Sequence, residues 1–380
     1  MDFQKREEEA GLKSEGLQEG WIMGRKTRQA NFEILRVLAM LMVVTMHYLI
    51  KGEVAVSMSV NQEPVNLMAW FIQSSCIVAV NVYVLISGYF LIDTKWSVRK
   101  LLSIICQVWF YSLGIPLVCL CLSIGGVGEW GLYDWLAVLF PFQMEHYWFA
   151  TAYVILYLLT PVIKAALEGL KEQEFRGVIF SLLLFFSVGK SIIPVKVPTD
   201  RYGYDFGWFI CLYLIAGYLR LYGVGWFNRI RKGLLVYGMG TAVIFLYSVL
   251  LGYLSQKGLP LSYAMDMTFS YNHLLVLISS LGLFYGFRYM RLSHTRTGIV
   301  CTRIAPYIFG VYLLHENIAI RSLWQSWFGT HLVRDSLLFL PHMLFTVFSV
   351  FLLGILVDYI RYSIFQRLFG VMDRLGKQKG

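Results

Sequence analysis

The chain has 380 residues, of which 57% are apolar and only 15% are charged, and its mean hydropathy is +0.60. A soluble domain carries about a quarter charged residues, so this composition excludes an ordinary soluble protein. The net charge is +10, from 33 basic and 23 acidic residues. Because the basic residues follow the ends of apolar runs, anionic membrane lipid is the expected partner, and nucleic acid is not.

Continuous apolar runs predict an all-α, polytopic transmembrane helical bundle, because a run of about twenty residues crosses a bilayer as a helix. The runs lack the alternation of apolar and polar positions that a membrane β-barrel requires. About ten spans are expected on this criterion. They cover residues 30–50, 68–92, 101–124, 147–166, 176–193, 205–222, 233–254, 271–290, 304–325 and 341–365.

Lys and Arg gather at one set of span ends, as in residues 95–100, and are sparse at the other set. Since basic loops stay in the cytoplasm, both termini are expected there, which agrees with an even number of spans. Translation could begin at Met1 or at Met23, and no apolar signal-peptide core precedes the first span. The expected parts are a cytoplasmic tail at 1–29, a transmembrane domain at 30–365 and a second cytoplasmic tail at 366–380.

The first span carries two ionisable residues, Arg36 and His47, on an otherwise almost wholly apolar face. Their separation is three helical turns plus roughly 20°, so both side chains leave the same stripe, about 16 Å apart along the axis. A titratable side chain at membrane depth is costly and normally faces a bundle interior or a wet cavity. The alternative is an Arg that extends to the interface and a structural His.

This spacing suits a ligand that runs along the helix, such as acyl-coenzyme A, with its anionic nucleotide head and its flexible arm ending in a thioester. A guanidinium near the cytoplasmic face, that of Arg36, suits the phosphates. An imidazole three turns deeper, that of His47, can act as a general base toward an acceptor hydroxyl. The same imidazole could instead carry the acyl group transiently, and the sequence leaves both routes open.

Four segments occur in a recognisable order: Arg36-x10-His47, then NVYVLISGYFL at 81–91, YWFATAYVILYLLTPVI at 147–163 and FGVYLLHENI at 309–318. Together they resemble acyltransferase family 3, integral-membrane O-acyltransferases that modify cell-surface glycans. The resemblance covers most of the membrane region. It implies that His47 is the catalytic histidine and that Arg36 is its essential partner.

Further residues are candidates for binding the donor. Ser87 and Tyr89 supply hydroxyls near the cytoplasmic end of the second span, where helix packing is the alternative role. The family resemblance implies a donor-binding Arg-x-x-Arg pair after them, but this chain has Lys100 and then Ser103 where a second arginine is expected. Arg99 and Lys100 therefore remain as candidates, and the ordinary inside-positive bias is the alternative.

Candidates for binding the acceptor lie at the outer mouth of the fourth span. Glu145, His146 and Trp148 can hydrogen-bond or stack on a sugar, although an ordinary polar rim and an aromatic interface anchor are the alternatives. His315 is expected in the middle of the ninth span, beside Glu316. Because a histidine at that depth needs a partner, a structural role beside the catalytic helix is favoured over direct catalysis.

Two acidic residues near helix ends, Asp205 and Asp358, are expected to be solvated or to cap helices. No metal is expected, because the six cysteines mostly lie inside apolar runs and no pair has metal-ligand spacing with nearby histidines.

These patterns and the resemblance to acyltransferase family 3 together imply a multi-pass plasma-membrane O-acetyltransferase that modifies a polysaccharide. The donor is cytosolic acetyl-CoA or another acyl-CoA, the acceptor is a hydroxyl of an extracellular or lipid-linked glycan, and no cofactor stays bound. The alternatives are a transporter or flippase of lipid-linked sugars and, less favoured, a glycan polymerase. The sequence leaves open the acceptor sugar, acetyl against succinyl, and the oligomeric state.

Overall fold

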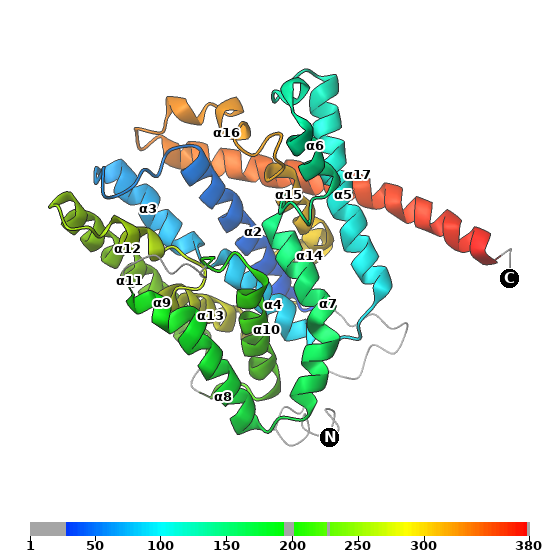
Figure 1. Cartoon of the computed structure of the whole chain (residues 1–380), viewed down its shortest axis with the longest axis horizontal. Coiled ribbons are helices and arrows are strands. Elements are labelled where there is room, and N and C mark those ends of the chain that lie inside the picture. The colour runs from blue at the N-terminus through cyan, green and yellow to red at the C-terminus, as the bar shows by residue number, and fades with distance from the viewer. Residues whose placement is uncertain (1–27, 194–200, 226–228, 378–380) are drawn as a thin grey trace.

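The computed structural model describes residues 28–193, 201–225 and 229–377, with side chains as far as Arg367. Residues 1–27 of the expected N-terminal tail and residues 378–380 of the expected C-terminal tail lie outside this described part, as does a possible start at Met23. The described secondary structure is helical throughout, which confirms the predicted all-α bundle (Figure 1).

Eight helical stretches in the described ranges are long and apolar enough to cross a membrane, and two shorter apolar helices accompany them. The number of spans and the side on which the termini lie stay predictions. The larger helices are α2 (Ala30–Lys51), α3 (Pro64–Cys76), α4 (Ala79–Leu91), α5 (Val98–Cys121), α7 (Trp148–Glu168), α8 (Glu172–Leu183), α10 (Phe206–Leu221), α11 (Ile230–Gln256), α13 (Leu274–Arg288), α14 (Arg296–Ile304), α15 (Ile308–His315) and α17 (Phe339–Lys377). The short elements are α6 (Leu132–Leu139), α9 (Gly189–Ile192), α12 (Ser262–Met267), α16 (Trp324–Trp327), a π-helical turn (Leu184–Val188) and 3-10 turns at Val127–Glu129, Ala305–Tyr307 and Thr330–Leu332.

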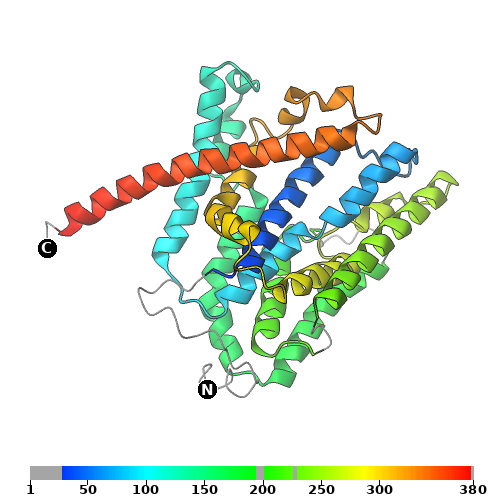
Figure 2. The ribbon, with the colours of Figure 1, turned by 180° about the vertical axis from the view of Figure 1, so that it is seen from behind.

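Helix α2 lies at the centre of the molecule. It packs against α3, α4, α13, α14, α15 and α17, which surround it in both views (Figures 1 and 2). The side chains of Arg36 and His47 on this helix are therefore enclosed by other helices rather than by lipid alone. This position explains how a helix that carries Glu33, Arg36, His47 and Lys51 is accommodated in an apolar bundle.

The boundaries predicted for the ninth span, 304–325, are wrong. The helical stretch begins earlier, at Arg296, and ends at His315, after which the chain turns. Asn317 explains the end, because its amide donates to the Tyr111 carbonyl at 3.0 Å and to the Tyr147 hydroxyl at 2.8 Å, while its Oδ1 accepts from the Ala319 N–H. His315 consequently lies at a helix terminus and not in the middle of a span.

Helix α17 crosses the back of the molecule and continues beyond the predicted end of the last span (Figure 2). It buries Asp358, which is 0% exposed, so the expectation of a solvated or capping role there is wrong. Asp358 forms a two-point ion pair with Arg361, at 2.7 and 2.9 Å, and accepts hydrogen bonds from Gln107 and Tyr111 of α5. Gly310 of α15 lets α17 come this close, since an added Cβ would lie 2.4 Å from that of Asp358. Asp205, by contrast, caps α10 as predicted.

Replacing Asp358 with Leu is expected to lower stability by about 3 kcal/mol or more, because Arg361 is then left buried without its counter-charge. The melting temperature of the purified protein in detergent measures this loss. A double variant, Asp358→Leu with Arg361→Met, removes both charges and should recover most of the lost stability. An equally unstable double variant would contradict the assignment of the loss to the unpaired charge.

Candidate active site

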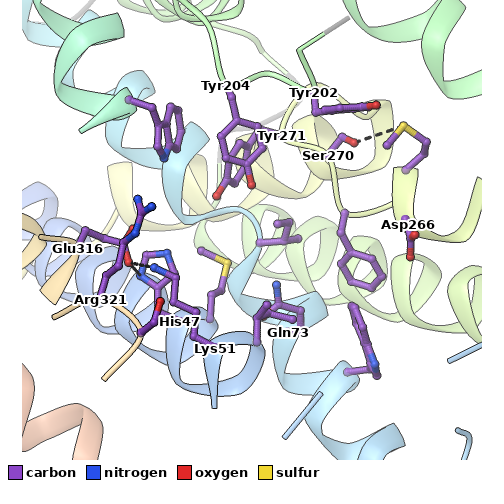
Figure 3. Close-up of a pocket in the computed structure, with 18 residues that line it drawn as sticks. His47, Lys51, Gln73, Tyr202, Tyr204, Asp266, Ser270, Tyr271, Glu316 and Arg321 are labelled. Atoms are coloured by element: carbon purple, nitrogen blue, oxygen red, sulfur yellow. Dashed lines mark hydrogen bonds and ion pairs between the residues drawn. The ribbon is translucent and has the colours of Figure 1, made fainter. Parts of the chain in front are cut away.

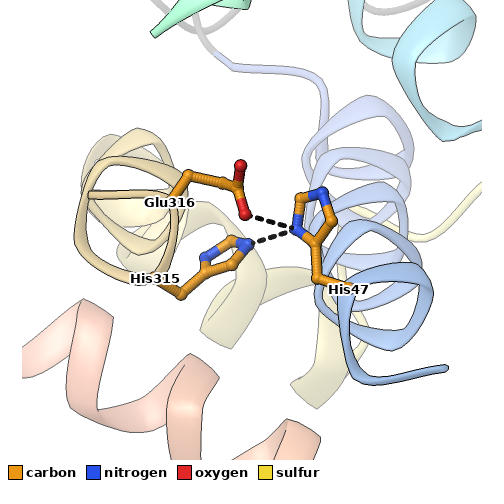
Figure 4. A group of neighbouring side chains, drawn as sticks. All are labelled: His47, His315 and Glu316. Atoms are coloured by element: carbon orange, nitrogen blue, oxygen red, sulfur yellow. Dashed lines mark hydrogen bonds and ion pairs between the residues drawn. The ribbon is translucent and has the colours of Figure 1, made fainter. Parts of the chain in front are cut away.

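His47 and His315 meet where α2 passes the end of α15 (Figure 4). Nδ1 of His47 lies 2.9 Å from Nε2 of His315 and 3.3 Å from Oε1 of Glu316. Nδ1 of His315 lies 2.6 Å from the carbonyl oxygen of Val311. A carbonyl can only accept, so Nδ1 of His315 carries the proton and its Nε2 has a lone pair. His47 must then donate through its own Nδ1, which leaves its Nε2 as a free base.

Nε2 of His47 points away from His315 and Glu316 in Figure 4. His47 lines a cavity of about 650 Å³ that is bordered by aromatic side chains and by several charged groups (Figure 3). Nε2, the nitrogen that can take a proton, therefore lies on the opposite side of the His47 ring from His315 and Glu316. Such a ring, held at one nitrogen and free at the other, is the arrangement that general-base chemistry needs.

Glu316 is 8% exposed and forms an ion pair with Lys51 in addition to its contact with His47. Burial alone would raise the pKa of Glu316, but the neighbouring His47 and Lys51 outweigh it and lower the pKa to about 2. Glu316 is therefore a carboxylate at physiological pH. Its negative charge lies beside the Nδ1 of His47, where it stabilises a positive charge that forms on the ring.

His47, His315 and Glu316 also offer three ligand atoms that lie within 4.8 Å of one another, so this group could hold a metal ion. Lys51 argues against that use, because its ammonium group already binds Oε1 of Glu316. A metal cation on the same oxygen would lie against this fixed positive charge. The hydrogen-bonded arrangement accounts for the geometry without such a clash.

Arg36 lies on the same helix toward its other end and is partly exposed, at 24%. Its guanidinium donates to Glu33 at 2.6 Å and lies 5.9 Å from the centre of the Phe90 ring. Glu33 is almost completely buried, and Arg28 lies 3.8 Å from its other oxygen. Sequence reasoning missed Glu33, although an acidic residue three positions before Arg36 in an apolar helix is a readable signal.

A second, smaller cavity of about 60 Å³ follows the stripe between the two ionisable residues. Met40, Val43 and His47 line it from α2, four, seven and eleven positions after Arg36. Its other walls are mainly aromatic. They are formed by Val80, Tyr83, Trp148, Phe149, Tyr271, Phe309 and Tyr312. Arg36 lines neither cavity. The space between Arg36 and His47 is narrow and apolar, because only the small cavity follows the stripe there.

The predicted donor-binding residues divide into two groups. Lys100 lies close enough to Arg36 for their charges to repel each other, and it also lies over the Tyr157 ring at 5.2 Å. Arg99, its neighbour, is exposed, and Ser87 faces Tyr153.

Tyr89 belongs to a different cluster. It is 4% exposed and packs against Phe32 and Phe284, while Arg220 and Arg288 lie 5.1 and 5.3 Å from its ring. The structure thus brings Lys100 toward Arg36 and places Tyr89 among aromatic rings and arginines.

The predicted acceptor-binding residues are also separated. Trp148 lines both cavities. Glu145 lines neither, and its carboxylate accepts two hydrogen bonds from Arg201, at 2.7 and 3.1 Å. His146 is 5% exposed and lines neither cavity.

Both ring nitrogens of His146 are occupied. Its Nε2 accepts from the Ile318 N–H at 3.1 Å. Ser112 donates its hydroxyl to the Val138 carbonyl, so it must accept from Nδ1 of His146, at 3.2 Å. This ring therefore fastens the turn that carries Glu316 to α5, and burial lowers its pKa to about 4.

The protein is expected to lose stability as the pH falls from about 6.5 toward 4, partly because of His146. In that window the unfolded chain binds a proton at this residue and the folded chain does not, which costs roughly 1.4 kcal/mol per pH unit. Melting temperatures measured across this range should fall more steeply for the wild-type protein than for a His146→Gln variant. Parallel slopes would contradict a neutral, buried His146.

Comparison with known proteins shows the family of the chain. A family model described as an acyltransferase domain matches residues 29–359, which is nearly the whole chain. No curated protein and no solved structure matches the chain. The match includes α2 with Arg36 and His47, the α15 terminus with His315, and the turn with Glu316. The chain belongs to acyltransferase family 3, and it is a multi-pass membrane acyltransferase.

Proposed function

We propose that this protein is a plasma-membrane O-acetyltransferase. It transfers an acetyl group from cytosolic acetyl-CoA to a hydroxyl of an extracellular or lipid-linked glycan. The observation that carries the proposal is the state of His47. Its Nδ1 is held by His315 and Glu316, its Nε2 has no hydrogen-bond partner among the described residues, and its ring lines the larger cavity.

The proposed reaction uses these contacts. Nε2 of His47 takes the proton of the acceptor hydroxyl as the hydroxyl oxygen attacks the thioester carbonyl. The carbon–sulfur bond then breaks, and the leaving thiolate takes the proton back from the ring. Glu316, a carboxylate 3.3 Å from Nδ1, stabilises the imidazolium that exists between these two proton transfers. This counter-charge favours a general base over an acyl-histidine.

In the proposed donor route, Arg36 and Lys100 bind the phosphates of the nucleotide head at one end of the stripe. Their positive charges lie close together, which suits a group with several negative charges. The thioester arm then occupies the narrow cavity beside Met40 and Val43. Because this cavity has only about 60 Å³, Tyr83 and Phe149 must move apart to admit the arm.

Replacing His47 with Ala should reduce acetyl transfer by roughly 10²-fold to 10⁴-fold, the contribution of a general base. The measurement is acetyl-CoA-dependent acetylation of surface glycan, followed by NMR, in cells that carry the variant. Membrane abundance is checked by immunoblot, and Ser322→Ala, at the same cavity but outside the proposed proton transfer, is the control. Wild-type acetylation in the His47→Ala strain would reject the proposal.

Replacing Val43 with Phe should raise the KM for acetyl-CoA by roughly tenfold or more, because the larger ring fills the proposed path of the thioester arm. Val43→Ala at the same position widens the path and should leave the KM unchanged or lower. Steady-state assays of the two variants in nanodiscs provide the comparison. An unchanged KM for the Phe variant would place the donor arm elsewhere.

A further inference from the structure

The larger cavity has an aromatic wall and a charged end. Trp148, Tyr204 and Tyr271 form a contiguous ring cluster, with centroids 4.5 to 5.7 Å apart. All three line the cavity together with His47 (Figure 3). Flat aromatic faces of this kind suit the apolar face of a sugar ring.

The charged end lies beside His47 and carries an excess positive charge. Lys51 and Glu316 are paired with each other there. Arg321 lines the same end, and within the described part of the chain its guanidinium has neither a hydrogen bond nor an ion pair. Its charge acts on both His47 and Lys51, so it lies near the proposed base. One positive charge is therefore left without a partner next to the position of the reacting hydroxyl.

The floor and the opposite end of the cavity offer hydrogen-bond acceptors instead of positive charge. Gln73 lines the cavity and is 6% exposed, and its Oε1 has no hydrogen-bond partner in the described residues. Asp266 lies at the end away from Arg321 and His47 in Figure 3. A buried amide oxygen and a carboxylate both accept hydrogen bonds. This side of the cavity thus suits hydroxyl or amide groups and repels an anion.

We infer that the acceptor is an acidic sugar, with its carboxylate or phosphate bound by Arg321 beside the hydroxyl that faces His47. Its ring would lie on the wall formed by Trp148, Tyr204 and Tyr271, and its neutral polar groups would point toward Gln73 and Asp266. This inference rests on the proposed function for the identity of the reacting hydroxyl. The negative charge could belong to the sugar itself or to the phosphate of a lipid carrier.

Binding to the full-length protein in nanodiscs tests this assignment without acetyl-CoA. The probes are glucuronate, glucose 1-phosphate and glucose, which share a ring and differ in charge, with inorganic phosphate as the anion without a sugar. Isothermal titration should show glucuronate or glucose 1-phosphate binding more tightly than glucose. The Arg321→Gln variant should lose roughly tenfold to hundredfold for the anionic probe, as expected for a charge-assisted hydrogen bond, and should bind glucose unchanged.

Two matched variants sharpen the test. Arg321→Lys keeps the charge and should retain part of the preference, and Ser322→Ala, at the neighbouring cavity residue, should leave all affinities unchanged. A response to glucuronate alone assigns the anion to a carboxylate, and a response to glucose 1-phosphate alone assigns it to a phosphate. Equal affinity for glucose and both charged sugars would overturn the inference, as would equally strong binding of inorganic phosphate.

An activity measurement separates this inference from the proposed function. If Arg321 instead stabilised the reacting thioester, Arg321→Gln would slow donor hydrolysis in the absence of any acceptor, and that result would overturn its assignment to the acceptor. Full acetylation by the His47→Ala variant would reject the proposed function, yet it would not alter the sugar-binding measurements. Each idea can therefore fail without the other.

Discussion

The backbone carbonyl of Val311 determines which ring nitrogen carries the proton in both His315 and His47. It fixes the proton of His315 on Nδ1, which obliges His315 to accept through Nε2 and His47 to donate through Nδ1. The chemistry available to His47 is decided by this chain of hydrogen bonds, since only its Nε2 can then act as a base. Glu316 supports the same orientation through its contact with the donating nitrogen.

The turn that carries Glu316 is held by residues from several helices, which explains how such a geometry persists at a helix terminus. Asn317 binds the Tyr111 carbonyl of α5 and the Tyr147 hydroxyl at the start of α7, and His146 accepts from the backbone of Ile318. Tyr111 in turn donates to Asp358 of α17. Buried polar groups that satisfy one another in this way rigidify the elements they join.

The sequence allowed the bundle and the helix that carries Arg36 and His47 to be predicted, because both depend on local periodicity. It did not allow the end of α15 to be predicted, since Asn317 stops the helix through contacts with α5 and α7, which are distant in the chain. The burial of Asp358 was missed for the same reason. His146 looked like a polar rim residue because a loop position gives no sign that both ring nitrogens are already bonded inside the protein.

The narrow, apolar space along α2 has a consequence for the cell as well as for the reaction. His47, Trp148 and Tyr271 border both cavities, so these three side chains stand between the small inner space and the large one. In the proposed reaction the donor comes from one face of the bilayer and the acceptor from the other, so a wide path between them would leak protons and salts. A gap of about 60 Å³ walled by aromatic rings does not hold the hydration shell that a crossing ion requires. The proposed donor path is therefore too narrow to pass hydrated ions between turnovers.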